Sequence, residues 1–112
     1  MGTGFWLERD PDSVLGAEFA FVRADRSVET DHFYPGPPDL AVEVISWSNP
    51  ASTIAEKTAR WLDAGVRAVV VVDSEAETVA VHRASGVAHA DAVLAVDDVL
   101  PGWRLAVAEI FE

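Results

Sequence analysis

The chain has 112 residues, half of them hydrophobic, which is enough for one globular domain with a modest core. It carries 19 acidic against 8 basic residues, a formal net charge of −11. This balance gives no sign of the basic stripe that duplex-binding surfaces use. The acids indicate either a well-solvated surface or, where they gather, a cation site.

The chain contains no cysteine, which excludes disulfides, thiolate metal sites and cysteine nucleophiles. This composition agrees with a reducing compartment, so we expect a cytoplasmic protein. No apolar run approaches the roughly 20 residues that a membrane helix needs. The first six residues lack the basic and apolar segments of a signal peptide. We therefore expect no membrane partner.

The N-terminal third predicts two strands and a loop. Residues 3–8 and 18–23 are predicted strands, separated by a turn at 10–13. In the second strand Glu18 shares a face with Ala20 and Val22, which leaves space above the sheet beside the acid. The proline-rich segment 24–37 predicts a loop. It carries His32, a ligand candidate whose simpler interpretation is an exposed loop histidine.

The next predicted strand, residues 39–46, has apolar residues on both faces, so we expect it to be central and covered on both sides. Asp39 and Glu43 share one face with Ala41 and Ile45. A carboxylate in the middle of such a strand is costly unless it is paired, hydrogen-bonded or bound to a metal. Glu43 is thus either a structural acid or part of a functional site, and the pattern alone does not decide between them.

A helix is predicted after this strand, with Asn49 as N-cap and Pro50 in the first turn. Its buried stripe consists of Ile54, Thr58, Trp61 and Leu62, with Gly65 as its stop. Lys57, the only lysine in the sequence, borders this stripe. Spacing alone favours a structural role, in which the stem of the lysine follows the stripe and its ammonium reaches water. The spacing gives less support to a catalytic role.

The C-terminal half predicts strands at 67–72, 77–83 and 88–96, a turn at 100–103, and a segment at 105–111 that is part strand and part short helix. The strand at 67–72 should be parallel to 39–46, because a helix connects the two. His82 and His89 lie in the predicted hairpin, at surface positions with nothing to place them near the acids. The fold class is α/β (α+β), a mixed β-sheet with one main helix crossing between core strands.

These segments resemble the Uma2 family of restriction-endonuclease-like proteins, within the PD-(D/E)XK nuclease superfamily. The resemblance rests on residues 38–46, 56–66, 69–73, 100–103 and 108–111, and residues 3–5, 9–12 and 21–23 are also similar. It covers nearly the whole chain and implies one restriction-endonuclease-like domain over residues 1–112. Family members normally begin with a helix and a strand pair ahead of residues 4–5. We expect this chain to lack that helix, as a truncated or a shortened member.

The resemblance also implies the site residues. The superfamily pattern has a proline–aspartate on one strand, an acid on the next, and a lysine that this family usually supplies from the following helix. On this chain Glu43 is the second acid and Lys57 the lysine. Glu18 corresponds to the first acid, and its longer side chain changes the geometry of a site. Asp39 fits the family's second proline–aspartate, as a supporting or metal-linked acid.

The implied reaction is metal-assisted hydrolysis of DNA phosphodiesters, with Glu18 and Glu43 as ligands of Mg²⁺ or Mn²⁺. Lys57 would orient the attacking water or stabilise charge on the phosphate. The alternative is a catalytically inactive nuclease fold that serves as an interaction or regulatory module. The acidic charge and the replacement of proline–aspartate by Ala17 and Glu18 favour that alternative. Since we expect an uncovered sheet edge, we also expect a homodimer.

Overall fold

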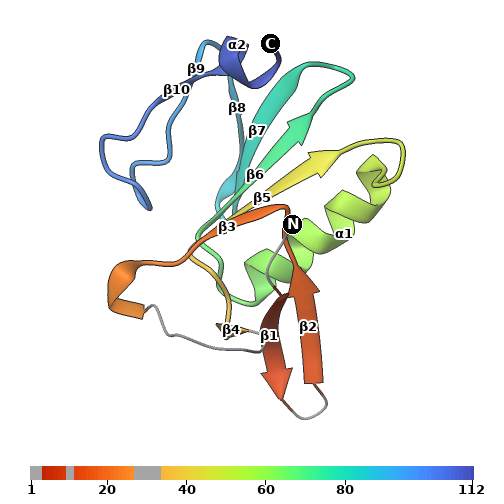
Figure 1. Ribbon diagram of the computed structural model, residues 1–112, viewed down its shortest axis with the longest axis vertical. Helices are drawn as coiled ribbons and strands as arrows, with labels where there is room; N and C mark the ends of the chain where they lie inside the picture. The colour runs from red at the N-terminus through yellow and green to blue at the C-terminus, as the bar shows by residue number, and fades with distance from the viewer. Residues whose placement is uncertain (1–3, 10–11, 27–33) are drawn as a thin grey trace.

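Residues 4–9, 12–26 and 34–112 are described by the computed structural model of the protein. The main sheet has five strands in the order β3-β5-β6-β7-β8 (Figure 1). These are β3 (Phe19–Phe21), β5 (Leu40–Ile45), β6 (Ala68–Asp73), β7 (Thr78–Arg83) and β8 (Gly86–Ala90). The predicted parallel pairing of β5 with β6 is confirmed, and the other three pairings are antiparallel.

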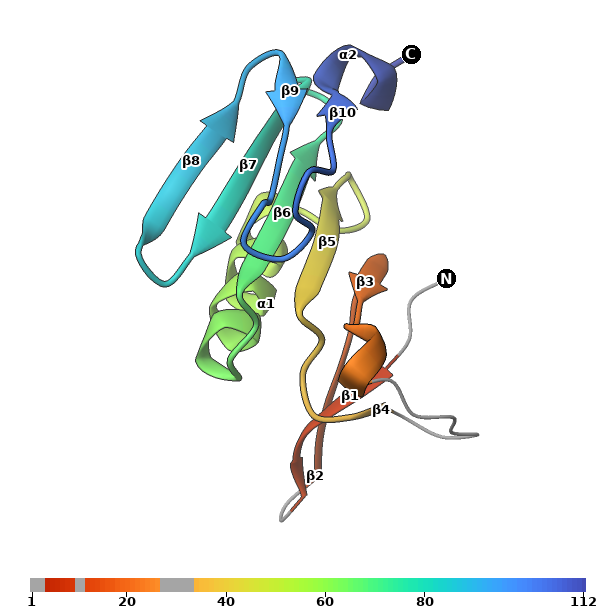
Figure 2. The ribbon, with the colours of Figure 1, turned by 90° about the vertical axis from the view of Figure 1, so that its left-hand side faces the viewer.

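The helix α1 (Ala51–Asp63) connects β5 to β6 and lies along one face of the sheet, while the chain after β8 crosses the other face (Figure 2). Parallel neighbours need such a crossover, because a tight turn cannot join them. The predicted mixed sheet with one main helix between its core strands is therefore confirmed.

The helix begins one residue later than predicted. Its N-cap is Pro50, and no side chain in the described part of the chain caps it, so the prediction of Asn49 as N-cap is wrong. Asn49 closes a turn instead, since its carbonyl accepts the N–H of Ser46 at 2.9 Å and its own N–H donates to Ser46 O at 3.1 Å. The first helical hydrogen bond then runs from Ile54 N–H to Pro50 O.

The helix ends where predicted, at Gly65. This glycine has φ = +104°, and its N–H donates to Leu62 O, while Val66 N–H donates to Trp61 O, each over 3.1 Å. The two bonds form a Schellman motif, which satisfies carbonyls that the end of a helix leaves unpaired. The chain can then enter β6 directly.

An N-terminal hairpin packs on the helix side of the sheet. It consists of β1 (Gly4–Arg9) and β2 (Asp12–Gly16), and the short β4 (Tyr34–Pro35) pairs with β1. The sequence predicted the first strand but missed β2, which begins inside the expected turn. The expected loop likewise contains β4 and the 3₁₀ helix η1 (Ala24–Arg26). His32 and the centre of the predicted turn at 10–13 lie outside the described residues.

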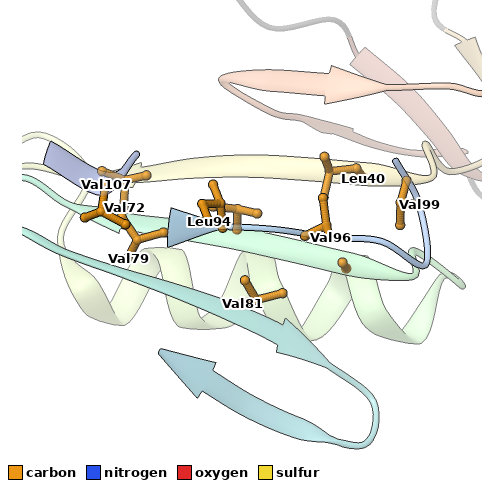
Figure 3. Close-up of a cluster of buried hydrophobic side chains, with 10 residues drawn as sticks. Leu40, Val72, Val79, Val81, Leu94, Val96, Val99 and Val107 are labelled. Carbon is orange, nitrogen blue, oxygen red and sulfur yellow. The ribbon is translucent and has the colours of Figure 1, made fainter. Parts of the chain in front are cut away.

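Two apolar cores sandwich the sheet. The core on the helix side joins Phe5, Leu15 and Ala17 of the N-terminal segment to Trp61 of α1 and to β5 and β6. The other core, drawn in Figure 3, packs β5, β6 and β7 against Leu94, Val96, Val99 and Val107. The predicted buried stripe of α1 is confirmed for Ile54, Thr58 and Trp61.

The C-terminal segment forms β9 (Val93–Leu94), β10 (Leu105–Ala106) and α2 (Val107–Ile110). The predicted strand at 88–96 is thus split between β8 and β9, because the chain leaves the main sheet after Ala90 to cover its face. The prediction of part strand and part helix for 105–111 is confirmed. No helix in the described ranges is long and apolar enough to cross a membrane.

Candidate functional site

The candidate site is an ion pair between β5 and α1. Glu43, in the middle of β5, has a side chain that is only 1% exposed. Lys57 of α1 donates from Nζ to Oε1 of Glu43 over 3.0 Å, and its side chain is 25% exposed. Because a parallel crossover returns over its own strands, the helix lies above β5 and brings the two residues together. The sequence singled out both residues, and the fold joins them.

The indole of Trp61 binds the second oxygen of Glu43. Its Nε1–H donates to Oε2 over 2.8 Å, so each oxygen of the carboxylate accepts a hydrogen bond from α1. Lys57 and Trp61 are four residues apart and therefore share one face of the helix. The sequence analysis used Trp61 only as a stripe residue. The missed signal was that a buried indole N–H needs an acceptor, and Glu43 was the buried acid expected nearby.

The packing around Trp61 fixes this arrangement. Its ring is fully buried and meets Phe5 of the N-terminal hairpin edge to face, with centroids 5.8 Å apart and an interplanar angle of 78°. Edge-to-face contacts are a preferred geometry for aromatic pairs. The ammonium of Lys57 compensates the charge of Glu43, which offsets the cost of burying a carboxylate.

Glu18 lies near Glu43 in the register of the β3–β5 ladder but makes no hydrogen bond or ion pair with it among the described residues. The last pair of the β3–β5 ladder is Phe19 with Val42, so Glu18 directly precedes one member and Glu43 directly follows the other. Glu18 is exposed and occupies a bend before β3 rather than the strand in which we predicted it. Within the described ranges, no hydrogen bond or ion pair joins it to Glu43 or Lys57.

Asp39 binds a different set of donors. Its side chain is 6% exposed; Oδ1 accepts from Arg26 Nη1 at 2.7 Å, and Oδ2 accepts the backbone N–H of Arg23 at 2.8 Å. Both partners belong to the segment around η1. These contacts attach that segment to the start of β5, and none of them reaches Glu43 or Lys57.

A small hollow of about 110 Å³ lies between α1 and the sheet, and its lining includes neither Glu43 nor Lys57. Ile45, Thr58 and Val71 line it next to Glu43 or Lys57, and His82 lines it from β7. Burial and the charge of His89 lower the pKa of His82 below its usual 6.5. The register of β5, β6 and β7 places His82 on the same face of the sheet as Glu43.

Comparison with protein families matches residues 2–108 to the Uma2 model, described as "Putative restriction endonuclease". The chain belongs to the Uma2 family. The match covers more than half of the chain, including β5, α1 and β6. Comparison with curated proteins finds no match.

A solved structure supports the fold of this Uma2 protein. A protein of Anabaena variabilis ATCC 29413, described as "a putative nuclease belonging to DUF820", superposes with a TM-score of 0.79 at 16% sequence identity. The superposition covers 98% of the present chain but 64% of the other, so the present chain spans less than two thirds of that relative. At this identity the likeness shows the fold alone.

The donor chemistry of this Uma2 chain suits a divalent cation in part. Carboxylate oxygens are the ligands that Mg²⁺ prefers, and Mg²⁺ commonly uses one or two of them together with water and substrate phosphate. Among the described residues, however, no three His, Cys, Asp or Glu side chains gather closely enough to hold a metal. Glu43 and Glu18 are of the right ligand type for such a cation, but Glu18 lies in the exposed bend before β3. Each oxygen of Glu43 accepts a hydrogen bond, so Glu43 would have to give up one of these bonds to bind a cation.

Proposed function

We propose that residues 1–112 act as one restriction-endonuclease-like domain that hydrolyses DNA phosphodiesters with the help of Mg²⁺ or Mn²⁺. The observation that carries this proposal is the buried pair of Glu43 and Lys57 on adjoining elements of a Uma2 fold. Buried charge pairs are costly to build, and they cluster at functional sites. A cytoplasmic location follows from the proposed substrate.

Each residue of the site has a proposed role. Glu43 would hold the cation, with exposed Glu18 as the second carboxylate. When bound, the cation supplies a water of lowered pKa and screens the phosphate. Lys57, at the edge of the site, would place its ammonium on the water or on a phosphate oxygen, where negative charge develops. Asp39 would support the start of β5 through Arg23 and Arg26.

The acidic charge sets how the proposed substrate would bind. With a net charge of −11, the chain repels DNA at long range, and four arginines are already paired with aspartates at 2.7 to 3.2 Å. The metal ions then become the main positive charge that a phosphate meets. We expect weak binding to DNA that depends on divalent cations.

The test combines calorimetry with cleavage assays. Mn²⁺ and Mg²⁺ binding is measured for the wild type, Glu43→Gln, Lys57→Met and Glu109→Gln, and the same proteins are incubated with plasmid and single-stranded DNA. Glu109 is an exposed acid of α2, so its variant is a matched control for charge. We expect Glu43→Gln to lose binding and cleavage, and Lys57→Met to lose cleavage alone. A folded wild type that binds neither ion overturns the proposal.

A second candidate function is an inactive nuclease fold that acts as an interaction or regulatory module. Its support is that both oxygens of Glu43 already accept hydrogen bonds, and that Ala17 and Glu18 replace the family's proline–aspartate. The same experiment separates the two functions. Absence of metal binding in the folded wild type would favour the module.

We also propose a homodimer that pairs through β8. This strand ends the main sheet, and its residues Gly-Val-Ala-His-Ala include no lysine, arginine, acid or proline, the residues that usually protect a sheet edge. Sedimentation velocity is expected to show a dimer that Val87→Lys dissociates. Val93→Lys, at a comparably exposed valine of β9, is the control. A monomeric wild type at tens of micromolar would contradict the pairing.

A further inference from the structure

We propose that Trp61 is a positioning residue that holds Oε2 of Glu43 in place, so that Oε1 is the oxygen that exchanges its donor, Lys57, for a divalent cation. The part of this inference that concerns the cation rests on the proposed function. The difference between the two hydrogen bonds rests on the contacts of Glu43 with Lys57 and Trp61, and the experiment below tests the two parts of the inference separately.

Trp61 cannot leave Glu43 without opening the core. Its side chain is fully buried, its ring packs edge to face on Phe5, and its backbone carbonyl accepts the N–H of Val66 in the motif that ends α1. An indole has one N–H donor, and a buried donor that loses its acceptor keeps the full cost of its desolvation. The 2.8 Å bond to Oε2 is therefore the fixed one.

Lys57 can leave Glu43 at much lower cost. Its side chain is one quarter exposed, and its flexible four-carbon stem can move the ammonium from Oε1 into water without displacing the helix. An ammonium that enters water regains its hydration, whereas the buried indole N–H would find no solvent. A divalent cation at Oε1 would continue to compensate the charge of Glu43 after the exchange.

This asymmetry links cation binding to the release of Lys57. While the ammonium of Lys57 donates to Oε1 of Glu43, it is not free to act on a substrate. If Glu43 held a cation through Oε1, the ammonium of Lys57 would be free at the exposed edge of the same site, where it could meet a phosphate. Glu43 would then act as a ligand through one oxygen, because Trp61 keeps the other.

The metal-free protein tests the difference between the two hydrogen bonds directly. The chain has four tryptophans, and the indole N–H of Trp61 is identified in ¹⁵N spectra by its loss in Trp61→Phe or, if that variant does not fold, by its contacts to the Phe5 ring. Hydrogen exchange of this N–H is measured in the wild type, in Lys57→Met and in Trp47→Phe. Trp47 is almost fully exposed, so Trp47→Phe is a control at a surface tryptophan. In the wild type and in Lys57→Met, the N–H of Trp47 is the unprotected reference.

We expect the Trp61 N–H to remain protected in Lys57→Met, within about threefold of the wild type, because the indole stays buried and keeps its acceptor after the ammonium is removed. Loss of protection in a folded Lys57→Met protein overturns the inference. In the folded Trp61→Phe protein, we expect the affinity for Mn²⁺ to fall about tenfold. In Lys57→Met, we expect the affinity for Mn²⁺ to rise, because the ammonium no longer competes for Oε1 of Glu43. A Mn²⁺ affinity that is higher in Trp61→Phe than in Lys57→Met overturns the inference as well.

Addition of Mg²⁺ then tests the cation. We expect the Trp61 N–H to stay protected while the Lys57 Nζ resonance shifts toward that of a hydrated lysine. If Mg²⁺ exposes the Trp61 N–H, the cation binds Oε2 and the inference is wrong. If Mg²⁺ changes neither signal, the proposed function fails, and the exchange data from the metal-free protein still decide whether Trp61 is the fixed partner.

Discussion

The indole Nε1 of Trp61 lies 2.8 Å from Oε2 of Glu43, although the two residues are 18 positions apart in the sequence. This bond connects β5, an interior strand of the main sheet, to the last turn of α1. It also places a buried acid inside an otherwise apolar core that includes Ala41, Val69 and Val71. The acid therefore contributes to folding as well as to any reaction, and the two contributions need separate measurements.

Glu43→Ala removes the acceptor of two donors. The buried Trp61 N–H then has no partner, while Lys57 can turn to water. We expect a loss of about 1–3 kcal/mol in the free energy of unfolding, mainly for the orphaned indole N–H. Urea unfolding at pH 7 measures it, with Glu109→Ala as an exposed control expected to stay within about 0.5 kcal/mol of the wild type. Equal stability of both variants would mean that the bond to Trp61 contributes nothing.

Asp39→Ala tests whether this acid is structural. The variant removes the acceptor for Arg26 and for the backbone N–H of Arg23. We expect a loss of about 1–3 kcal/mol in the free energy of unfolding, as for other buried acceptors of charged donors, with Mn²⁺ affinity unchanged. The control is Asp25→Ala, whose exposed side chain pairs only on the surface with Arg23. A parallel loss of Mn²⁺ affinity would make Asp39 part of the metal site.

The parts of the fold that the sequence predicted well depend on local rules. The alternation around Glu43 and the spacing of the apolar stripe of α1 predicted a central strand and its crossover helix, because burial on both sides leaves a clear pattern. Gly65 likewise marked the end of the helix, since few other residues adopt a positive φ. Lys57 and Glu43 were singled out by a rare residue type and an unusual buried position.

The parts that the sequence missed depend on tertiary contacts. The strand β2 begins with Asp12 and Ser13, which have turn-like composition, and pairing with β1 overrides that preference. Asn49 has the chemistry of an N-cap, but its backbone is committed to a turn with Ser46. Whether Glu18 joins the site depends on a bend before β3 that no local pattern announced.

Gly65→Ala tests the end of α1. An added Cβ at this position would meet nothing within 4 Å, so any cost arises from the backbone φ of +104° and not from a clash. We expect the free energy of unfolding to fall by about 1–2 kcal/mol, the usual cost of a left-handed conformation for a residue with a side chain. Gly65→Asn should recover part of it, because asparagine tolerates this region. Thermal and urea unfolding measure both, and an unchanged Gly65→Ala protein would contradict the role.

Asp98→Asn tests a surface link between β7 and the C-terminal segment. Arg83 donates to both carboxylate oxygens of Asp98, from Nε at 2.9 Å and from Nη2 at 2.8 Å. The hydrogen bonds from Arg83 lower the pKa of Asp98 below its usual value. Since the pKa is depressed in the folded state, the link stabilises the fold above the usual aspartate pKa of about 3.9, and this contribution is lost as the pH falls through the lower folded value.

The expected size of this effect is small, because the side chain of Asp98 is 42% exposed and solvent screens the pair. We expect Asp98→Asn to lower the free energy of unfolding by less than about 1 kcal/mol at pH 7 and low salt. The difference from the wild type should shrink in 1 M NaCl and should disappear once the pH is below the folded pKa of Asp98. Urea unfolding across this range measures it, with exposed Asp91→Asn as control. A difference that persists in acid would show that Asp98 stabilises the chain through packing and not through its charge.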